Sequence, residues 1–172
     1  TSLLTFPPLR SPEDRQALLD ALKQGKIDIL TSNHTTRPLG DMNSTIKLGL
    51  PMLDTFGSVV VWLIQQGVDP LVIFKVLCKN PGQWLSQFTD QKADRVGRIK
   101  EGYTANITVI AFGKPAIDSR QLYTKCGWSP FDIRTLKGSV EAVFLRGEKV
   151  VSDKWMKDFR TSKTSTVALP RM

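Results

Sequence analysis

Apolar residues recur at helical spacing in the first part of the chain. Ser11 is a good N-cap residue, Pro12 suits the first helical position, and acidic residues follow in the first turn. The apolar positions with this period are Ala17, Leu18, Ala21 and Leu22. Gly25 ends the pattern, so we expect a helix to about Gln24 and then a short buried strand from Ile27 to Leu30. A helix that leads into a buried strand is typical of an α/β protein.

The predicted strand leads directly into a polar stretch, residues 31–38, where the chain must leave the sheet. Ile29, inside the strand, is expected to be buried. Because barrel enzymes place their chemical groups at the carboxyl ends of strands, residues 31–38 are the first candidate for a site. Three consecutive helices are then predicted: from Leu53 to Gln66, ending at Gly67; from Asp69-Pro70 to Lys79; and a short one from Asn80-Pro81 that carries Trp84 and Leu85.

Beyond Asp90 the pattern changes to short strand-like runs separated by turns. The predicted strands are Arg98–Lys100, Ile107–Ile110, Val140–Leu145 and Val150-Val151. Residues 101–103 are turn-like, and residues 146–148 form the turn of a hairpin between the last two strands. A small β unit is therefore expected after the helical part.

The formal net charge of +8 raises the possibility of nucleic-acid binding, because clustered Lys and Arg neutralise phosphates. The basic residues are mostly interspersed with acids, however, and the densest excess lies at the end of the chain. There Lys154, Lys157, Arg160, Lys163 and Arg171 outnumber Asp153 and Asp158. We interpret this segment as a solvated tail, with nucleic-acid binding as the alternative.

Membrane insertion and cysteine chemistry are both disfavoured. No apolar run approaches the roughly 20 residues of a membrane-spanning helix, and the first residues lack the pattern of a signal peptide, so we expect a cytoplasmic protein. Cys78 and Cys126 fit no metal-ligand spacing, and reduced thiols are expected.

Several segments match a known pattern in the same order. They are Pro7–Arg15, Ile27–Leu30 leading into Asn33-His34, Leu53–Thr55, Asn80-Pro81, Gly97–Ile107, Lys125–Phe131, and Leu136–Gly138 through Arg146-Gly147. Together they resemble the cyclic amidohydrolases of the amidohydrolase superfamily, the group to which dihydroorotase, hydantoinase and allantoinase belong. From Asn80 onward the match is especially similar to dihydroorotase. The resemblance covers about residues 5–151, and the order of the segments is more specific than any one of them.

The resemblance implies an α/β fold that is only part of such an enzyme. Residues 1–90 would be the C-terminal part of a (β/α)8 barrel, comprising its last strand or two and the helices that follow. Residues 91–151 would form a small C-terminal β domain, and residues 152–172 a basic, mobile tail. The metal-binding histidines and bridging lysine of the family belong to earlier barrel strands that have no counterpart here. The sequence contains one histidine, so we expect neither metal ligands nor a cofactor in this chain; zinc would require a complementing N-terminal half.

The catalytic position implied by the resemblance is altered. In such enzymes an aspartate at the end of the last barrel strand binds metal and moves a proton, and that position is Asn33 here. An amide has no titratable carboxylate and cannot act as a general base. A purely structural role for Asn33, hydrogen bonding to loop backbone, is the alternative. His34 is interpreted as a hydrogen-bonded structural residue rather than a ligand.

Further departures fall on the same implied substrate pocket. Arg37 occupies the position of a substrate-binding histidine; it could bind a carboxylate but cannot accept a proton. Phe6 stands where an asparagine is expected, and Pro51-Met52 where a proline-glycine loop is expected. Arg10, in the matching segment after the double proline, completes the pocket-like set. Trp128 and Phe131 are expected to pack the β domain against the helices.

Three hypotheses follow. The first is a catalytically silent, dihydroorotase-like fragment or subunit with a scaffold role in pyrimidine biosynthesis. Its partner would be the missing N-terminal barrel half, a second copy, or a pathway protein such as aspartate carbamoyltransferase. The second is a piece of an active zinc-dependent dihydroorotase whose metal ligands lie on another segment. The third is nucleic-acid binding through the basic tail.

Overall fold

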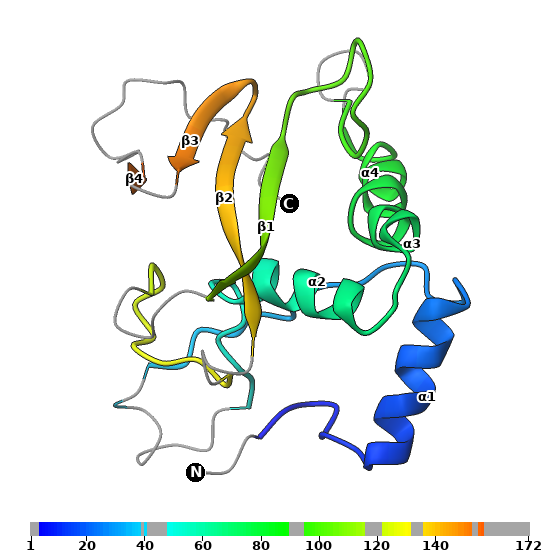
Figure 1. Cartoon of the computed structure of the whole chain (residues 1–172), viewed down its shortest axis with the longest axis vertical. Helices are drawn as coiled ribbons and strands as arrows, with labels where there is room; N and C mark the ends of the chain where they lie inside the picture. The colour runs from blue at the N-terminus through cyan, green and yellow to red at the C-terminus, as the bar shows by residue number, and fades with distance from the viewer. Residues whose placement is uncertain are drawn as a thin grey trace.

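The computed structural model describes residues 4–38, 40, 48–89, 95–115, 122–131, 136–152 and 155–156. Its helices are α1 (Pro12–Lys23), α2 (Phe56–Gln65), α3 (Pro70–Phe74), a π-helical segment (Lys75–Lys79) and α4 (Asn80–Leu85). Its strands are β1 (Ile107–Pro115), β2 (Lys137–Leu145), β3 (Glu148–Ser152) and β4 (Trp155–Met156). The helices lie on one side of the molecule and the sheet on the other, with α2 across the base of the sheet (Figure 1). No described helix is long and apolar enough to cross a membrane.

Helix α1 begins and ends as the sequence predicts. The Ser11 hydroxyl accepts a hydrogen bond from the amide of Asp14 at 3.2 Å, and the Asp14 carboxylate accepts one from the Ser11 amide at 3.3 Å. This reciprocal pair satisfies amides that the first helical turn would leave free. At the other end, Gly25 adopts φ +68°, and Lys26 donates back to the carbonyl of Ala21, which closes the helix in a Schellman arrangement.

The prediction of a buried strand from Ile27 to Leu30 is wrong. The segment is not part of a sheet, and Ile29 is 38% exposed. The Leu30 amide instead donates to the carbonyl of Val76, in the π-helical segment, at 3.1 Å. A strand requires a neighbouring strand to complete its ladder, and none lies beside these residues in the described part of the chain. Ile27 and Leu30 still pack against the helical core.

The three predicted helices after the polar stretch are confirmed, with one change in their junction. Helix α3, the π-helical segment and α4 follow one another without a break. Pro81 lies two residues after the π-helical segment; it lacks an amide hydrogen, and its ring would clash with the carbonyl four residues earlier in a regular α-helix. The wider π turn accommodates this proline.

The sheet is antiparallel, with strand order β1-β2-β3-β4. The hairpin between β2 and β3 is confirmed, with its turn at Arg146-Gly147. The predicted strand at Arg98–Lys100 is wrong, because these residues form a bend that leads into the turn at 101–103. The sheet continues into the predicted tail through Trp155–Met156. The basic residues of that tail lie outside the described residues, so the nucleic-acid alternative stays a prediction.

Helix α2 and strand β2 interlock at two glycines. A Cβ atom at Gly138 would overlap the side chain of Val61, and one at Gly57 would lie 2.5 Å from Val140. The buried hydroxyl of Ser58 donates to the Gly138 carbonyl at 2.7 Å. The main core continues from α2 to α1 and α3 through Leu22, Val60, Leu63, Val68, Ile73 and Val76. The sheet is therefore fixed closely against the helical part.

Candidate functional site

A cavity of about 360 Å³ lies where the N-terminal segment crosses the polar stretch after Leu30. Its lining residues are Thr5, Phe6, Pro7, Leu9, Ser32, Asn33, Thr35, Leu48, Gly49, Leu50 and Met52. Three of the residues selected from the sequence, Phe6, Asn33 and Met52, therefore come together around one space. Residues far apart in the sequence build it, and the backbone links them: the Thr35 amide donates to the Leu50 carbonyl at 3.0 Å.

Asn33 lies at the turn that ends the extended segment. It adopts φ +44°, a left-handed conformation that asparagine tolerates better than most residues. Its side chain is exposed at the cavity. The backbone shape by itself is a sufficient reason for an asparagine, so the structural interpretation and the pocket interpretation both fit this position.

His34 has a defined hydrogen-bonding role. It forms an isolated parallel bridge with Leu50, and its Nδ1 atom accepts hydrogen bonds from the amides of Met52 at 3.1 Å and Leu53 at 3.2 Å. Both partners are backbone amides, which can only donate, so Nδ1 is the acceptor in both contacts. The Nδ1 lone pair is thereby used to hold the loop before α2.

Arg37 is not among the residues that line the cavity, and it is buried, with 4% of its surface exposed. Its Nε and Nη1 atoms have no hydrogen-bond partner among the described residues. Its backbone carbonyl accepts a hydrogen bond from the indole Nε1 of Trp128 at 2.7 Å, which joins the segment after His34 to residues 122–131. This contact is with a loop residue, and the packing of Trp128 and Phe131 between the β domain and the helices stays a prediction.

The remaining pocket-like residues do not line the cavity. Pro51 is buried, and it directly precedes Met52, which does line the cavity. Arg10 is exposed, and its Nε atom lies 3.9 Å from the carboxylate of Asp14. Of the pocket-like positions, Phe6, Asn33 and Met52 line this cavity, whereas Arg10, His34, Arg37 and Pro51 are not part of its lining.

Sequence reasoning did not anticipate the role of Asp54. Its carboxylate accepts hydrogen bonds from the amides of Tyr123 and Thr124, each at 3.1 Å, and from the Thr124 hydroxyl. This contact ties the start of α2 to the segment before Cys126. Nothing local in the sequence signals it, since the partners lie about 70 residues apart.

The cavity has little capacity for acid–base or metal chemistry of its own. Its described lining contains no carboxylate, histidine, cysteine, lysine or arginine. In the described part of the chain, no three His, Cys, Asp or Glu side chains gather closely enough to hold a metal ion. The Nδ1 atom of His34, a possible metal ligand next to Asn33 in sequence, already accepts hydrogen bonds from two backbone amides. The donor set therefore does not fit the zinc centre that the resemblance implies.

Comparison with known proteins gives a consistent relationship. No protein-family model matches the chain. The dihydroorotase of Pyrococcus horikoshii is 32% identical over 164 residues, which cover 88% of this chain and 34% of that protein. The dihydroorotase of Listeria innocua is 31% identical over 160 residues, which cover 86% of this chain and 34% of that protein. The chain thus spans about a third of the length of the curated relatives it matches.

Solved structures agree on the fold. The L-hydantoinase (dihydropyrimidinase) of Arthrobacter aurescens superposes with a TM-score of 0.77 at 22% identity, covering 90% of this chain and 35% of that one. The D-hydantoinase (dihydropyrimidinase) of a Thermus species superposes with a TM-score of 0.73 at 21% identity and the same coverage. The α/β architecture expected from the sequence, part of a barrel followed by a small β unit, is confirmed.

Proposed function

This chain is dihydroorotase-like and corresponds to the C-terminal portion of a cyclic amidohydrolase, and we propose that it acts through assembly rather than through catalysis of its own. One observation carries the proposal. In the polar stretch after Leu30, where chemistry is expected, the cavity presents the Asn33 amide, and the Nδ1 atom of the adjacent His34 accepts hydrogen bonds from two backbone amides. The Asn33 amide has no group that can act as a base. The Nδ1 atom of His34 cannot accept a proton from an attacking water molecule while it accepts its two hydrogen bonds.

The buried guanidinium of Arg37 supports association. Arginine stays protonated in proteins, and a buried charge without a partner is costly. Two of its nitrogens lack an acceptor among the described residues, so this side chain can still bind an acceptor that lies outside them. The missing N-terminal part of a dihydroorotase-like protein is the first candidate to supply it. The other candidates to supply this acceptor are a second copy of the chain and another protein of pyrimidine synthesis, such as aspartate carbamoyltransferase.

Activity measurements on the purified chain test this proposal. Hydrolysis of a cyclic amide at neutral pH needs a group that generates hydroxide and a base, and the base contributes about 100- to 10,000-fold. We expect no detectable turnover of dihydroorotate or of a hydantoin with added zinc, and zinc binding no tighter than about micromolar by elemental analysis after dialysis. Asn33→Asp should behave like Asn33→Ala, because one carboxylate does not complete a metal site.

Zinc-dependent, saturable turnover by the unmodified chain would refute the proposal, provided that it survives repurification and is abolished by a chelator.

A second candidate function is that of one piece of an active dihydroorotase. The observation in its favour is that the 360 Å³ cavity still gathers Phe6, Asn33 and Met52 beside the polar stretch that follows Leu30. This alternative requires that a complementing N-terminal polypeptide, rich in histidine ligands, restores turnover to the unmodified chain. Under the leading proposal, turnover in that complex would additionally require Asn33→Asp.

A further inference from the structure

A polar cavity of about 260 Å³ lies where α4 meets residues 95–98 of the loop that precedes the sheet. Its lining residues are Lys79, Gly82, Gln83, Ser86, Arg95, Val96, Arg98 and Tyr103. In this described lining, three side chains carry a positive charge and none is acidic. The cavity shares no lining residue with the one at Asn33, so it is a separate feature of the molecule.

Backbone contacts fix this loop against the helices. A Cβ atom at Gly82, on α4, would lie 2.7 Å from the carbonyl oxygen of Val96. One at Gly97 would overlap the carbonyl of Cys78, the residue directly before Lys79. Each glycine therefore permits a close approach that a side chain would prevent. As a result, cations from two separate segments of the chain are held around one space.

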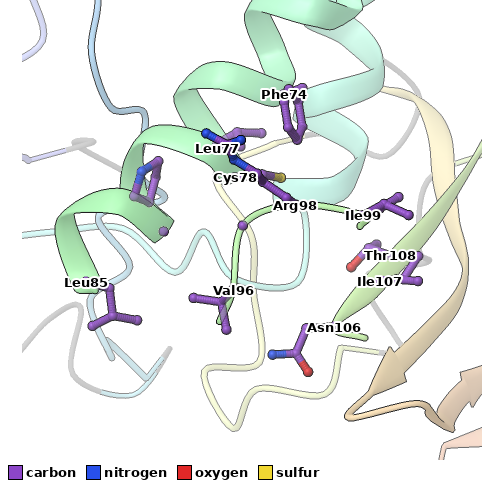
Figure 2. A pocket seen from close by; sticks show the side chains of 13 residues that line it. Phe74, Leu77, Cys78, Leu85, Val96, Arg98, Ile99, Asn106, Ile107 and Thr108 are labelled. Atoms are coloured by element: carbon purple, nitrogen blue, oxygen red, sulfur yellow. The ribbon is translucent and has the colours of Figure 1, made fainter. Parts of the chain in front are cut away.

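Lys79 and Arg98 are the two cations on which the site depends. Arg98 extends from the loop to the helical segment that carries Cys78, as the view of the neighbouring apolar cavity shows (Figure 2). Lys79 is half-buried in the π-helical segment. Neither cation forms an ion pair with an acid of the described residues; Glu101 lines an adjacent cavity with Arg98 but makes no ion pair with it. A partly desolvated cation without a counter-charge attracts an anion.

Neutral hydrogen-bond donors complement these charges. Tyr103 is half-buried, and its hydroxyl makes no hydrogen bond to a described residue. Its position is fixed by the backbone, because its amide donates to the Lys100 carbonyl at 3.0 Å and the Thr104 amide donates to the Arg95 carbonyl at 2.7 Å. Gln83 adds a side-chain amide with two hydrogens. The lining thus offers several donors to a group that has several oxygens.

We propose that this cavity binds a phosphate dianion, either inorganic phosphate or the phosphate group of a small ester. A phosphate group carries a charge of about −1.5 to −2 at pH 7, which matches two cations better than the single charge of a carboxylate does. The planar guanidinium of Arg98 can meet two of its oxygens, and the Lys79 ammonium a third. Pockets for drug-sized ligands measure about 300–1,000 Å³, so a cavity of about 260 Å³ suits a phosphate with few further atoms.

Calorimetric titration of the whole chain with inorganic phosphate, and separately with ribose 5-phosphate, tests the site. We expect saturable binding with a Kd of about 0.1–1 mM. Lys79→Ala and Arg98→Ala should each weaken it by about 10-fold. Arg98→Lys should weaken it less, because lysine keeps the charge and loses only the planar fork. Arg98 is exposed, so its variants keep the test valid even if circular dichroism shows that Lys79→Ala is unfolded.

Lys75→Ala is the matched control. It removes an exposed lysine from the same π-helical segment, four residues before Lys79 and outside the cavity lining. The net charge of the chain changes by the same amount as in Lys79→Ala. Phosphate should bind this variant normally.

The two ligands and an NMR measurement define the occupant and its place. Tighter binding of ribose 5-phosphate identifies a small phosphate ester, and tighter binding of inorganic phosphate identifies the free ion. Either ligand should shift the amide signals of Val96, Gly97 and Tyr103. The signals of residues 5–9 and 32–35, around the cavity at Asn33, should stay unchanged.

Four results would overturn the proposal. The first is the absence of saturable binding up to about 20 mM of either ligand. The second is equal weakening by Lys75→Ala and Lys79→Ala, which would show attraction to net charge alone. The third is acetate binding as tight as phosphate binding. The fourth is displacement of phosphate by a lower concentration of a short single-stranded oligonucleotide, which would assign these cations to nucleic acid.

Discussion

Replacement of Gly138 by alanine measures how tightly the helical part and the sheet are joined. Two costs are expected. Gly138 adopts φ +151°, a region that residues with a Cβ rarely enter, which costs about 1–2 kcal/mol. Its new methyl group would overlap the fully buried side chain of Val61, and such overpacking costs about 1–3 kcal/mol. The sum, about 2–5 kcal/mol, is a large share of the stability of a typical domain.

A second glycine separates these two contributions. Gly147 also has a positive φ, +84°, but a Cβ atom there would meet nothing within 4 Å. Gly147→Ala should therefore show the backbone cost alone, about 1–2 kcal/mol. Urea unfolding followed by tryptophan fluorescence and circular dichroism gives the free energy of unfolding for both variants.

A double variant completes the experiment. Val61→Ala removes the two clashing methyl groups but leaves the Val61 Cβ atom against the new side chain, so Gly138→Ala should recover only part of the overpacking cost of about 1–3 kcal/mol in that background. The interlocked geometry of α2 and β2 would be refuted if Gly138→Ala cost no more than Gly147→Ala, or if the two changes at Gly138 and Val61 were additive.

Three further predictions follow from individual side chains. Leu22→Ala should lower the free energy of unfolding by about 2–5 kcal/mol, whereas Ile29→Ala should lower it by about 1 kcal/mol or less; equal losses in urea unfolding would contradict the observed exposure of Ile29. Asp54→Ala should cost about 1–3 kcal/mol and Asp54→Asn less, because the amide keeps one acceptor oxygen; thermal unfolding that ranks them in reverse would exclude the carboxylate contact with Thr124. Burial raises the pKa of the Cys78 thiol, so its thiolate fraction at pH 8 is below that of an ordinary cysteine. Iodoacetamide should label it more slowly than a free thiol, at a rate that still climbs above pH 9, and a plateau below pH 8 would contradict this.

The raised pKa of Cys78 also makes the free energy of unfolding depend on pH. The folded state holds the thiol proton more tightly than the unfolded chain does, so the contribution of this group to stability is fully present below the unfolded pKa. It is lost as the pH rises through the folded value.

The family and part of the pocket could be predicted from the sequence because several short segments occur in a characteristic order. Phe6, Asn33 and Met52 were selected on that basis, and they do line one cavity. Arg37 was selected on the same basis, but it is buried and does not line that cavity. A linear motif identifies which positions face a site in the relatives, but the direction of each side chain depends on contacts distant in sequence.

Local chemistry alone determined where α1 begins, where α1 and α2 end, and where the chain turns between β2 and β3. The Ser11 cap of α1 involves residues three apart, and Gly25 and Gly67 end their helices because glycine readily adopts a positive φ. The β2–β3 turn at Arg146-Gly147 is equally local. Such interactions close within one turn of chain, so no tertiary contact is needed to predict them.

Only the tertiary structure decided what the segments between these elements do. Residues 27–30 have the composition of a buried strand, yet they form none, because a strand depends on a neighbour that composition does not supply. His34 became a backbone acceptor, and Asp54 an anchor for Thr124, through contacts that span 18 to 70 residues. The polar cavity beside α4 likewise exists only once the loop at residues 95–98 is packed against the helices, since its cations come from separate segments of the chain.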